Sequence, residues 1–241
     1  MEDKMFGKSF FSFIIVISAL LNAQWYRQEV PPGIDNISSV YFIDGRTGWA
    51  TTFQGAILKT TNGGRNWAKL RDTSNVSYGS IFFVDQNYGC VTGSNRYGYG
   101  FVNRTTDGGL TWSSTLSTFF AIKKLKFTSR SDGWAISGPV SRMKMGVIYK
   151  TTDGGLTWQD SPTELDATFS DIDIVDSRNG WVTGFYGTIQ KTTDGGGIWK
   201  HVKSISECFL TGVDFIDSLR GWVGGSNGRI FKTVDGGDNW T

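Results

Sequence analysis

The chain repeats one sequence block five times, and this repeat restricts the possible folds more than any other feature. Each block ends in a box with the pattern Thr-x-Asp-x-Gly-x-x-Trp, in which Asn replaces Asp in the first copy. The intervals between the closing tryptophans are 45, 46, 41 and 41 residues. A period of this size is typical of propellers and solenoids, in which each repeat forms one supersecondary unit. The third and last box positions are Asn62, Asp107, Asp153, Asp194 and Asp235, and Trp67, Trp112, Trp158, Trp199 and Trp240.

A second tryptophan position lies upstream in each block, directly after a glycine. It is occupied by Trp49, Trp134, Trp181 and Trp222, whereas Cys90 takes this place in the second block. Trp25 lies in phase with the box tryptophans, so all ten tryptophans occupy two repeat positions.

Each block contains four short strand candidates separated by turns that contain glycine. In the fourth copy these candidates are 171–175, 180–184, 188–192 and 199–203. A lone four-stranded sheet exposes both faces until neighbouring sheets cover them, so the period predicts an all-β propeller with four-stranded blades. A β-helix and a stack of hairpins are the alternatives.

The aspartate of the box could serve as a metal ligand or a catalytic acid, but five copies spread around a ring cannot converge on one site. We expect each aspartate to accept hydrogen bonds from the backbone of a tight turn, with the glycines at positive φ and the tryptophan packed over the hairpin. Asn62 keeps the acceptor and loses the charge, which suits a turn better than an acid.

The box resembles the Asp-box, or bacterial neuraminidase repeat. The wider pattern, Phe-x-Asp-x-x-x-Gly-Trp followed by Gly-x-Ile-x-Lys-Thr-x-Asp-Gly-Gly-x-x-Trp, is similar to the photosystem II stability and assembly factor propellers and their bacterial relatives. The resemblance covers Trp25 to Thr241, with departures at Asn62, Cys90, Thr128-Ser129 and Gly197-Ile198. It implies an exported seven-bladed propeller that binds proteins and has no enzymatic activity.

The N-terminal segment predicts export. Lys4 and Lys8 precede an apolar run over 10–21, and Asn22-Ala23-Gln24 follows it, as in a secretory signal. We expect residues 1–23 to be removed, which would make the mature chain secreted or periplasmic and leave it without a membrane anchor. An uncleaved anchor is the alternative.

Composition excludes several classes. The chain has 24 Lys and Arg against 22 Asp and Glu, and this net charge of +2 gives no electrostatic footprint for nucleic acid. Two cysteines and one histidine do not suit a zinc site, and no motif for another metal or a cofactor is present. Cys90 and Cys208 lie in strand-like runs of different blocks, so we expect two separate buried thiols and not a disulfide.

Blade counting suggests a piece of a longer protein. A fourth strand after Trp240 would need several more residues than Thr241, whereas residues 25–30 already look like a fourth strand. We therefore expect 24–241 to form five blades of a seven-bladed ring, followed in the full protein by further blades or a C-terminal sorting domain.

Two sets of residues are candidates for binding a protein partner. Arg46, Arg130, Arg178 and Arg220 recur before the glycine of the second strand, on the face of the ring that carries the boxes, and could bind carboxylates. On the other face, two lengthened loops between the second and third strands contain Arg96, Tyr97 and Tyr99, and Arg142, Met143, Lys144 and Met145. Tyr, Arg and Met favour protein interfaces. Solvated turn charges and loop drift are the alternatives.

An enzyme would need paired carboxylates in one pocket. One position of the first strand bears Tyr41, Phe82, Lys126, Asp173 and Asp214 in successive blocks, so a lysine and two aspartates can face the same way. These residues could form an acid/base pair or a salt-bridged column beside the channel. Sialidases of this repeat class use a Phe-Arg-Ile-Pro element, which this chain lacks. We therefore expect a non-catalytic binding protein, with a carbohydrate-active propeller acting on a glycan as the alternative.

Overall fold

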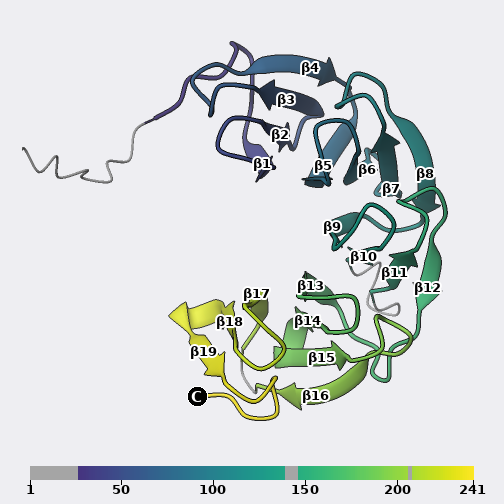
Figure 1. Cartoon of the computed structure of the whole chain (residues 1–241), viewed down its shortest axis with the longest axis vertical. Helices are drawn as coiled ribbons and strands as arrows, with labels where there is room; N and C mark the ends of the chain where they lie inside the picture. The colour runs from purple at the N-terminus through teal and green to yellow at the C-terminus, as the bar shows by residue number, and fades with distance from the viewer. Residues whose placement is uncertain (1–26, 139–145, 206–207) are drawn as a thin grey trace, which may run out of the picture.

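The computed structural model describes residues 27–138, 146–205 and 208–241. The described chain forms five antiparallel sheets that follow one another around an open arc, as Figure 1 shows. We number these sheets as blades 1 to 5 in chain order. The all-β propeller architecture is confirmed.

Four blades have four strands each, and the described part of blade 5 has three. The strands of blades 1 and 2 are β1 Ile37–Phe42, β2 Gly48–Thr52, β3 Ala56–Thr60, β4 Ala68–Asp72, β5 Val76–Phe83, β6 Gly89–Asn95, β7 Gly100–Thr105 and β8 Ser113–Thr118. The strands of blades 3 to 5 are β9 Ile122–Phe127, β10 Gly133–Ser137, β11 Ile148–Thr151, β12 Gln159–Ser161, β13 Phe169–Ile174, β14 Gly180–Gly184, β15 Thr188–Thr192, β16 Lys200–Ser204, β17 Leu210–Phe215, β18 Gly221–Gly225 and β19 Ile230–Thr233. Two single-turn 3-10 helices, η1 Phe185–Gly187 and η2 Ser226–Gly228, connect strands in blades 4 and 5.

Within each blade the first strand lies on the inner side of the arc and the later strands lie progressively further out (Figure 1). The four strands expected in the fourth block correspond to β13, β14, β15 and β16. The fourth strand expected over 25–30 is wrong for its described part, because residues 27–30 have no strand structure. Gln28 instead reaches blade 1 with its side chain, donating from Nε2 to the carbonyl of Gly63 at 3.3 Å.

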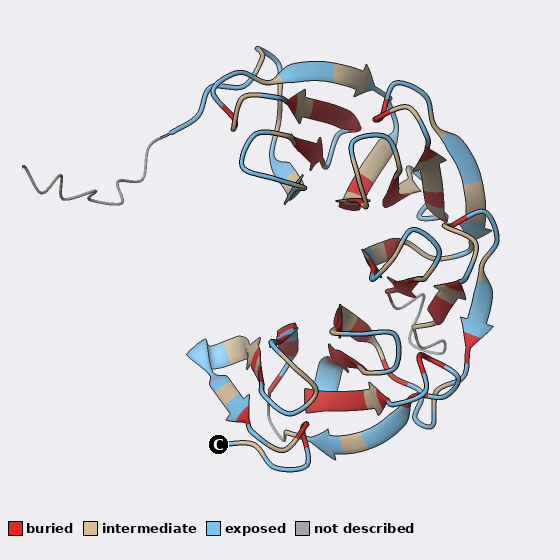
Figure 2. Ribbon diagram, viewed as in Figure 1, coloured by how far each residue is buried: buried red, intermediate tan, exposed pale blue. Residues whose placement is uncertain are grey.

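The core lies between adjacent blades, where the second and third strands of blades 1 to 4 are largely buried and the outermost strands face solvent (Figure 2). Trp49 of β2 stacks on Phe83 of blade 2 with ring centroids 3.6 Å apart, and Trp181 of β14 stacks in the same way on Phe215 of blade 5. Cys90, in the tryptophan position of blade 2, is buried and unbridged, and Cys208 is buried and unbridged too.

Each box forms the tight turn that its sequence predicts. Asp107 accepts a hydrogen bond from the N–H of Thr111 at 2.9 Å, and Asn62 accepts one from Asn66 at 3.0 Å. The two glycines of every box have positive φ, as Gly108 and Gly109 do at 75° and 95°. Asparagine therefore replaces aspartate in the first box without loss of the turn.

The box turns also join neighbouring blades. The carbonyl of Gly108 in blade 2 accepts hydrogen bonds from Trp49 Nε1 at 3.0 Å and Lys59 Nζ at 3.4 Å in blade 1. Trp181 Nε1 donates in the same way to Gly236 across blades 4 and 5. In blade 2, Cys90 replaces the tryptophan of the second strand. There Arg104 Nε, on the third strand, donates to the carbonyl of Gly154 in blade 3 at 2.8 Å. The repeated residues are thus those that hold one blade to the next.

Blade 4 departs from this pattern because Ile174 occupies the place of Phe83 and Phe215. Trp199 fills the space and is fully buried, whereas the other box tryptophans are partly exposed. Its Nε1 donates to Ser161 Oγ at 3.0 Å, and this hydroxyl donates to the carbonyl of Gly196. Trp199 therefore belongs to the contact between blades 3 and 4.

Candidate functional site

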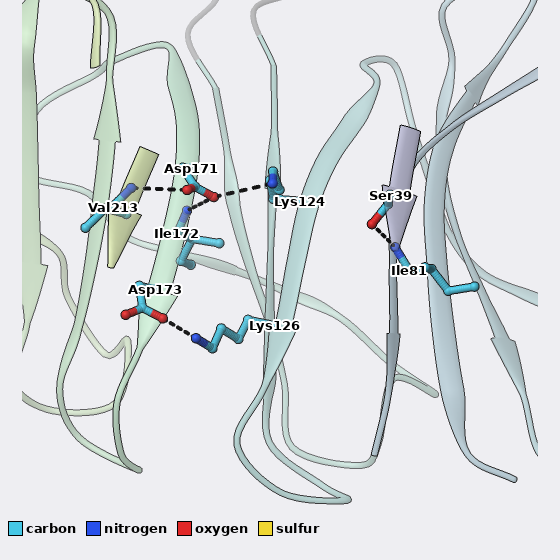
Figure 3. A network of polar contacts seen from close by, with 8 residues as sticks. All are labelled: Ser39, Ile81, Lys124, Lys126, Asp171, Ile172, Asp173 and Val213. Carbon is cyan, nitrogen blue, oxygen red and sulfur yellow. Dashed lines mark hydrogen bonds and ion pairs between the residues drawn. The ribbon is translucent and has the colours of Figure 1, made fainter. Parts of the chain in front are cut away.

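The inner strands carry a network of polar contacts that links blades 3, 4 and 5 (Figure 3). Lys126 of β9 forms an ion pair with Oδ1 of Asp173 on β13. Oδ2 of Asp173 accepts a hydrogen bond from the backbone N–H of Phe215 at 2.7 Å. Both carboxylate oxygens of Asp173 are therefore occupied, and the residue is 2% exposed.

A second pair of a lysine and an aspartate lies two residues earlier on the same two strands (Figure 3). Lys124 Nζ lies 3.9 Å from Oδ1 of Asp171, and Oδ2 of Asp171 accepts from the N–H of Val213 at 3.1 Å. Burial raises the pKa of Asp171, although the charge of Lys124 acts in the opposite sense. In blades 1 and 2 the corresponding contact is uncharged, because Ser39 Oγ accepts from the N–H of Ile81 at 3.3 Å.

These contacts provide hydrogen-bond acceptors for backbone N–H groups at the edge of each sheet. The first strand is an edge of its blade, so its outward-facing N–H groups have no strand partner. Side chains of the preceding blade accept from three of these groups: those of Ile81, Val213 and Phe215. The network is thus built as a lateral connection between blades.

The residues of the alternative acid/base pair lie in different surroundings. Lys126 and Asp173 come together, as the salt-bridged alternative expected. Asp214 is exposed on β17, and within the described residues its carboxylate takes part in no hydrogen bond or ion pair. In blades 1 and 2 the same strand position is aromatic, since Tyr41 and Phe82 occupy it with ring centroids 4.4 Å apart.

The predicted arginines all lie exposed on the box face, formed by the loops between first and second strands together with the box turns. They do not occupy equivalent positions in their turns. Each turn begins at a side chain that accepts backbone hydrogen bonds, and Arg130 follows this residue by one position, Arg46 and Arg178 by two, and Arg220 by three. Arg130 pairs with Asp85 of the preceding blade, and Arg220 pairs with Asp217 at 2.7 Å. Their binding of a partner stays a prediction.

The opposite face, which we call the loop face, consists of the loops between second and third strands and those between blades. Tyr97 and Tyr99 are exposed there, with the Arg96 guanidinium 4.6 Å from the ring centroid of Tyr97. Tyr99 contacts the 76% exposed Phe119, with centroids 6.0 Å apart. Arg142, Met143, Lys144 and Met145 lie outside the described residues.

A second aromatic cluster on the loop face was missed by the sequence analysis. It contains Phe185 and Tyr186 of η1 and Phe209, which precedes β17. The centroid of Phe209 lies 5.1 Å from that of Phe185 and 5.9 Å from that of Tyr186. The loop that contains Phe185 and Tyr186 is not lengthened, so its length did not mark it as a binding loop. The sequence feature that could have marked it is Tyr186, at the place where the next block has Asn227.

Among the described residues, no group of three or more His, Cys, Asp or Glu side chains is placed to hold a metal ion. The same part of the chain contains no helix whose length and apolar character would allow it to cross a bilayer.

Comparisons with known proteins agree with this architecture. Residues 156–241 match the family model described as photosynthesis system II assembly factor YCF48. A structure of YCF48 bound to a D1 peptide is 21% identical, with a TM-score of 0.66 over 85% of this chain and 67% of that one. YCF48 from Cyanidioschyzon merolae is 16% identical, with a TM-score of 0.52 over 89% and 87% of the two chains.

A glycoside hydrolase has a similar fold. The GH74 enzyme of Niastella koreensis is 17% identical, with a TM-score of 0.66, and the match covers 85% of this chain but 36% of the enzyme. No curated protein matches the sequence. The match over 156–241 and the YCF48 structures confirm the resemblance to the YCF48 family, and the chain has the β-propeller fold of those structures.

Proposed function

We propose that this chain is an exported, non-catalytic β-propeller that binds a protein partner and acts as a scaffold or assembly factor. The observation that carries the proposal is the concentration of exposed aromatic side chains on the loop face. Apart from Phe42, every exposed Phe and Tyr of the described residues lies there: Phe53, Tyr97, Tyr99, Phe119, Phe185, Tyr186 and Phe209. Aromatic residues and arginine are enriched in protein interfaces, where they supply most of the binding energy.

Two further facts support the proposal. YCF48 has been solved with a D1 peptide bound, so a propeller of similar fold takes a protein segment as its ligand. The N-terminal sequence has the order of charged, apolar and small residues that a secretory signal requires, which supports a secreted or periplasmic location.

The surroundings of the carboxylates favour a non-catalytic protein. A general acid or nucleophile must reach its substrate, whereas Asp173 is buried with both oxygens engaged and Asp171 bridges Lys124 and Val213. The fold similarity to GH74 enzymes keeps a carbohydrate-active propeller as the second candidate. In that case Asp173 and Asp214 would be the acids.

The test compares two faces of one protein. Immobilised wild-type chain and the triple variant Arg96→Ala/Tyr97→Ala/Tyr99→Ala are exposed to an extract of the native source, together with Arg46→Ala/Arg178→Ala as the box-face control. We expect a stoichiometric partner on wild type, reduced binding by the triple variant and retention by the control. Hydrolysis of a glycan by wild type, abolished in a folded Asp173→Asn variant, would establish the enzyme instead.

A further inference from the structure

The cluster of Phe185, Tyr186 and Phe209 presents three rings to solvent across the boundary between blades 4 and 5. The rings of Phe185 and Tyr186 are inclined to that of Phe209 by 59° and 57°. A sugar ring stacks with its C–H face on one open aromatic face, whereas rings inclined in this way contact a branched or aromatic side chain from several directions. The geometry therefore favours a peptide side chain over a carbohydrate.

Tyr186 is held in a conformation that a tyrosine rarely adopts. Its φ is 57°, in the left-handed region that Asn and Gly tolerate best. The equivalent residue of blade 5 is Asn227, with nearly the same φ of 61°. Tyr186 is also 78% exposed, so its ring gains little burial in exchange for this strain. Backbone strain that no packing contact offsets is typical of residues that bind a ligand or take part in a reaction.

The backbone beneath the cluster is fixed by hydrogen bonds. The N–H of Phe185 donates to the carbonyl of Thr168 at 3.0 Å, and the N–H of Ile205 donates to Gly187 at 2.9 Å. Phe209 donates to Ser226 Oγ at 3.0 Å, and its carbonyl accepts from the N–H of Ser226 at 2.9 Å. A surface ordered in advance loses little conformational entropy when it binds.

A cation lies beside the rings. Lys123 of blade 3 places Nζ 6.0 Å from the ring centroid of Phe185. Its stem packs over Gly138, where an added Cβ would lie 2.3 Å from Cε. Within the described part of the chain, Lys123 forms no ion pair, unlike its neighbours Lys124 and Lys126. The ammonium is therefore available to a carboxylate of a bound molecule.

We propose that Phe185, Tyr186, Phe209 and Lys123 bind a peptide segment of the partner, in which a large apolar side chain enters the cluster and a neighbouring carboxylate pairs with Lys123. The inference rests on the proposed function and specifies where and what the propeller binds. Rings of the cluster supply apolar area, and the lysine supplies selectivity for an acidic residue or a chain terminus.

The decisive variant is Tyr186→Asn, which introduces the residue found at the matching turn of blade 5. Because asparagine adopts positive φ more readily, the variant should fold with an unchanged or higher melting temperature. A loss of binding could then not be ascribed to unfolding. Leu110→Ala, which removes an exposed apolar side chain from the box turn of blade 2 on the opposite face, is the control.

The experiment selects short random displayed peptides on the immobilised wild-type chain and measures the affinities of the enriched sequences. We expect enriched peptides with an aromatic or large aliphatic residue next to an acid, and at least ~5-fold weaker binding by Tyr186→Asn. Lys123→Met should remove the preference for the acid over its amide, and Leu110→Ala should bind as wild type does.

Three outcomes would overturn the inference: no enrichment, equal affinity for wild type and Tyr186→Asn, or binding of cellohexaose in place of peptides. They are distinguishable from failure of the proposed function. If a native partner is captured and Tyr186→Asn retains it, protein binding stands and this location is wrong.

Discussion

Lys126 of blade 3 is paired with Asp173 of blade 4, which also accepts the hydrogen bond of the Phe215 N–H in blade 5. One buried carboxylate thus connects three blades. Replacing Asp173 by Ala should lower the free energy of unfolding by about 3 kcal/mol, because it leaves a lysine and a backbone N–H without their partner. Urea unfolding measures this change.

Asp214→Ala is the matched control, since Asp214 is the exposed aspartate at the same strand position of blade 5. Its substitution should change the free energy of unfolding by less than about 0.5 kcal/mol. Equal losses in the two variants would show that the contact between blades does not depend on the pair.

Stability should depend on pH through the boxes. Hydrogen bonds from Thr111 lower the pKa of Asp107 to about 2, and those from Asn239 lower the pKa of Asp235 to about 2. An unfolded aspartate titrates near ~3.9, so the stabilisation is present above this pH and is lost as the pH falls towards 2.

The variant Asp107→Asn copies the natural box residue Asn62 and removes one of these titrations. The free energy of unfolding should therefore fall less steeply with pH between about 4 and 2 in Asp107→Asn than in wild type. Asp238→Asn serves as the control, because this exposed box residue accepts none of the described hydrogen bonds of its turn. A slope unchanged by Asp107→Asn would contradict the account of the box.

Two glycines at equivalent turns allow the free-energy cost of left-handed backbone strain to be distinguished from the cost of a steric clash. Gly187 and Gly228 have φ of 68° and 67°, but a Cβ on Gly187 would lie 1.8 Å from the carbonyl oxygen of Ile205, whereas one on Gly228 meets nothing within 4 Å. Gly228→Ala should cost about 1 kcal/mol from left-handed strain alone. Gly187→Ala should cost at least about 3 kcal/mol, and thermal unfolding of the pair compares them.

Cys90→Trp restores the residue that the repeat pattern favours, yet it should destabilise the protein. The cavity beside Cys90 holds only about 10 Å³, and Phe82, Phe127 and Arg104 are among the residues that line it. Overpacking of this kind costs about 1 to 3 kcal/mol. A higher melting temperature for Cys90→Trp would show that the repeat pattern outweighs local packing.

The thiol itself gives an independent check of burial. Desolvation raises the pKa of Cys90 to about 12, so little thiolate is present at neutral pH. A thiol reagent should modify Cys90 only after unfolding, and fast modification of the native protein would contradict the packing.

The sequence predicted the parts of the molecule that every block repeats. The box turns recur in all five blocks, and the strands and the upstream tryptophan recur in most of them, so a weak signal in one block is supported by the others. The repeat pattern does not predict that Trp199 is buried. Its burial depends on Ile174, a residue of a different strand at a position where the other blades have phenylalanine.

The exposed aromatic side chains of the loop face were predicted only where a loop is long. Tyr97 and Tyr99 lie in a lengthened loop and are exposed as expected. Phe185 and Phe209 are 24 positions apart in loops of ordinary length, and only the packing of blade 4 against blade 5 brings their rings to 5.1 Å. Such juxtapositions depend on the angle between blades, which no local pattern specifies.

The most direct test of the account is cross-linking of the captured native partner to the propeller, followed by mass spectrometric identification of the linked residues. The account predicts cross-links on the loop face, with Lys123 among them, and loss of capture in the folded Tyr186→Asn variant. Cross-links confined to the box face around Arg46, Arg130, Arg178 and Arg220, with capture unaffected by Tyr186→Asn, would contradict it.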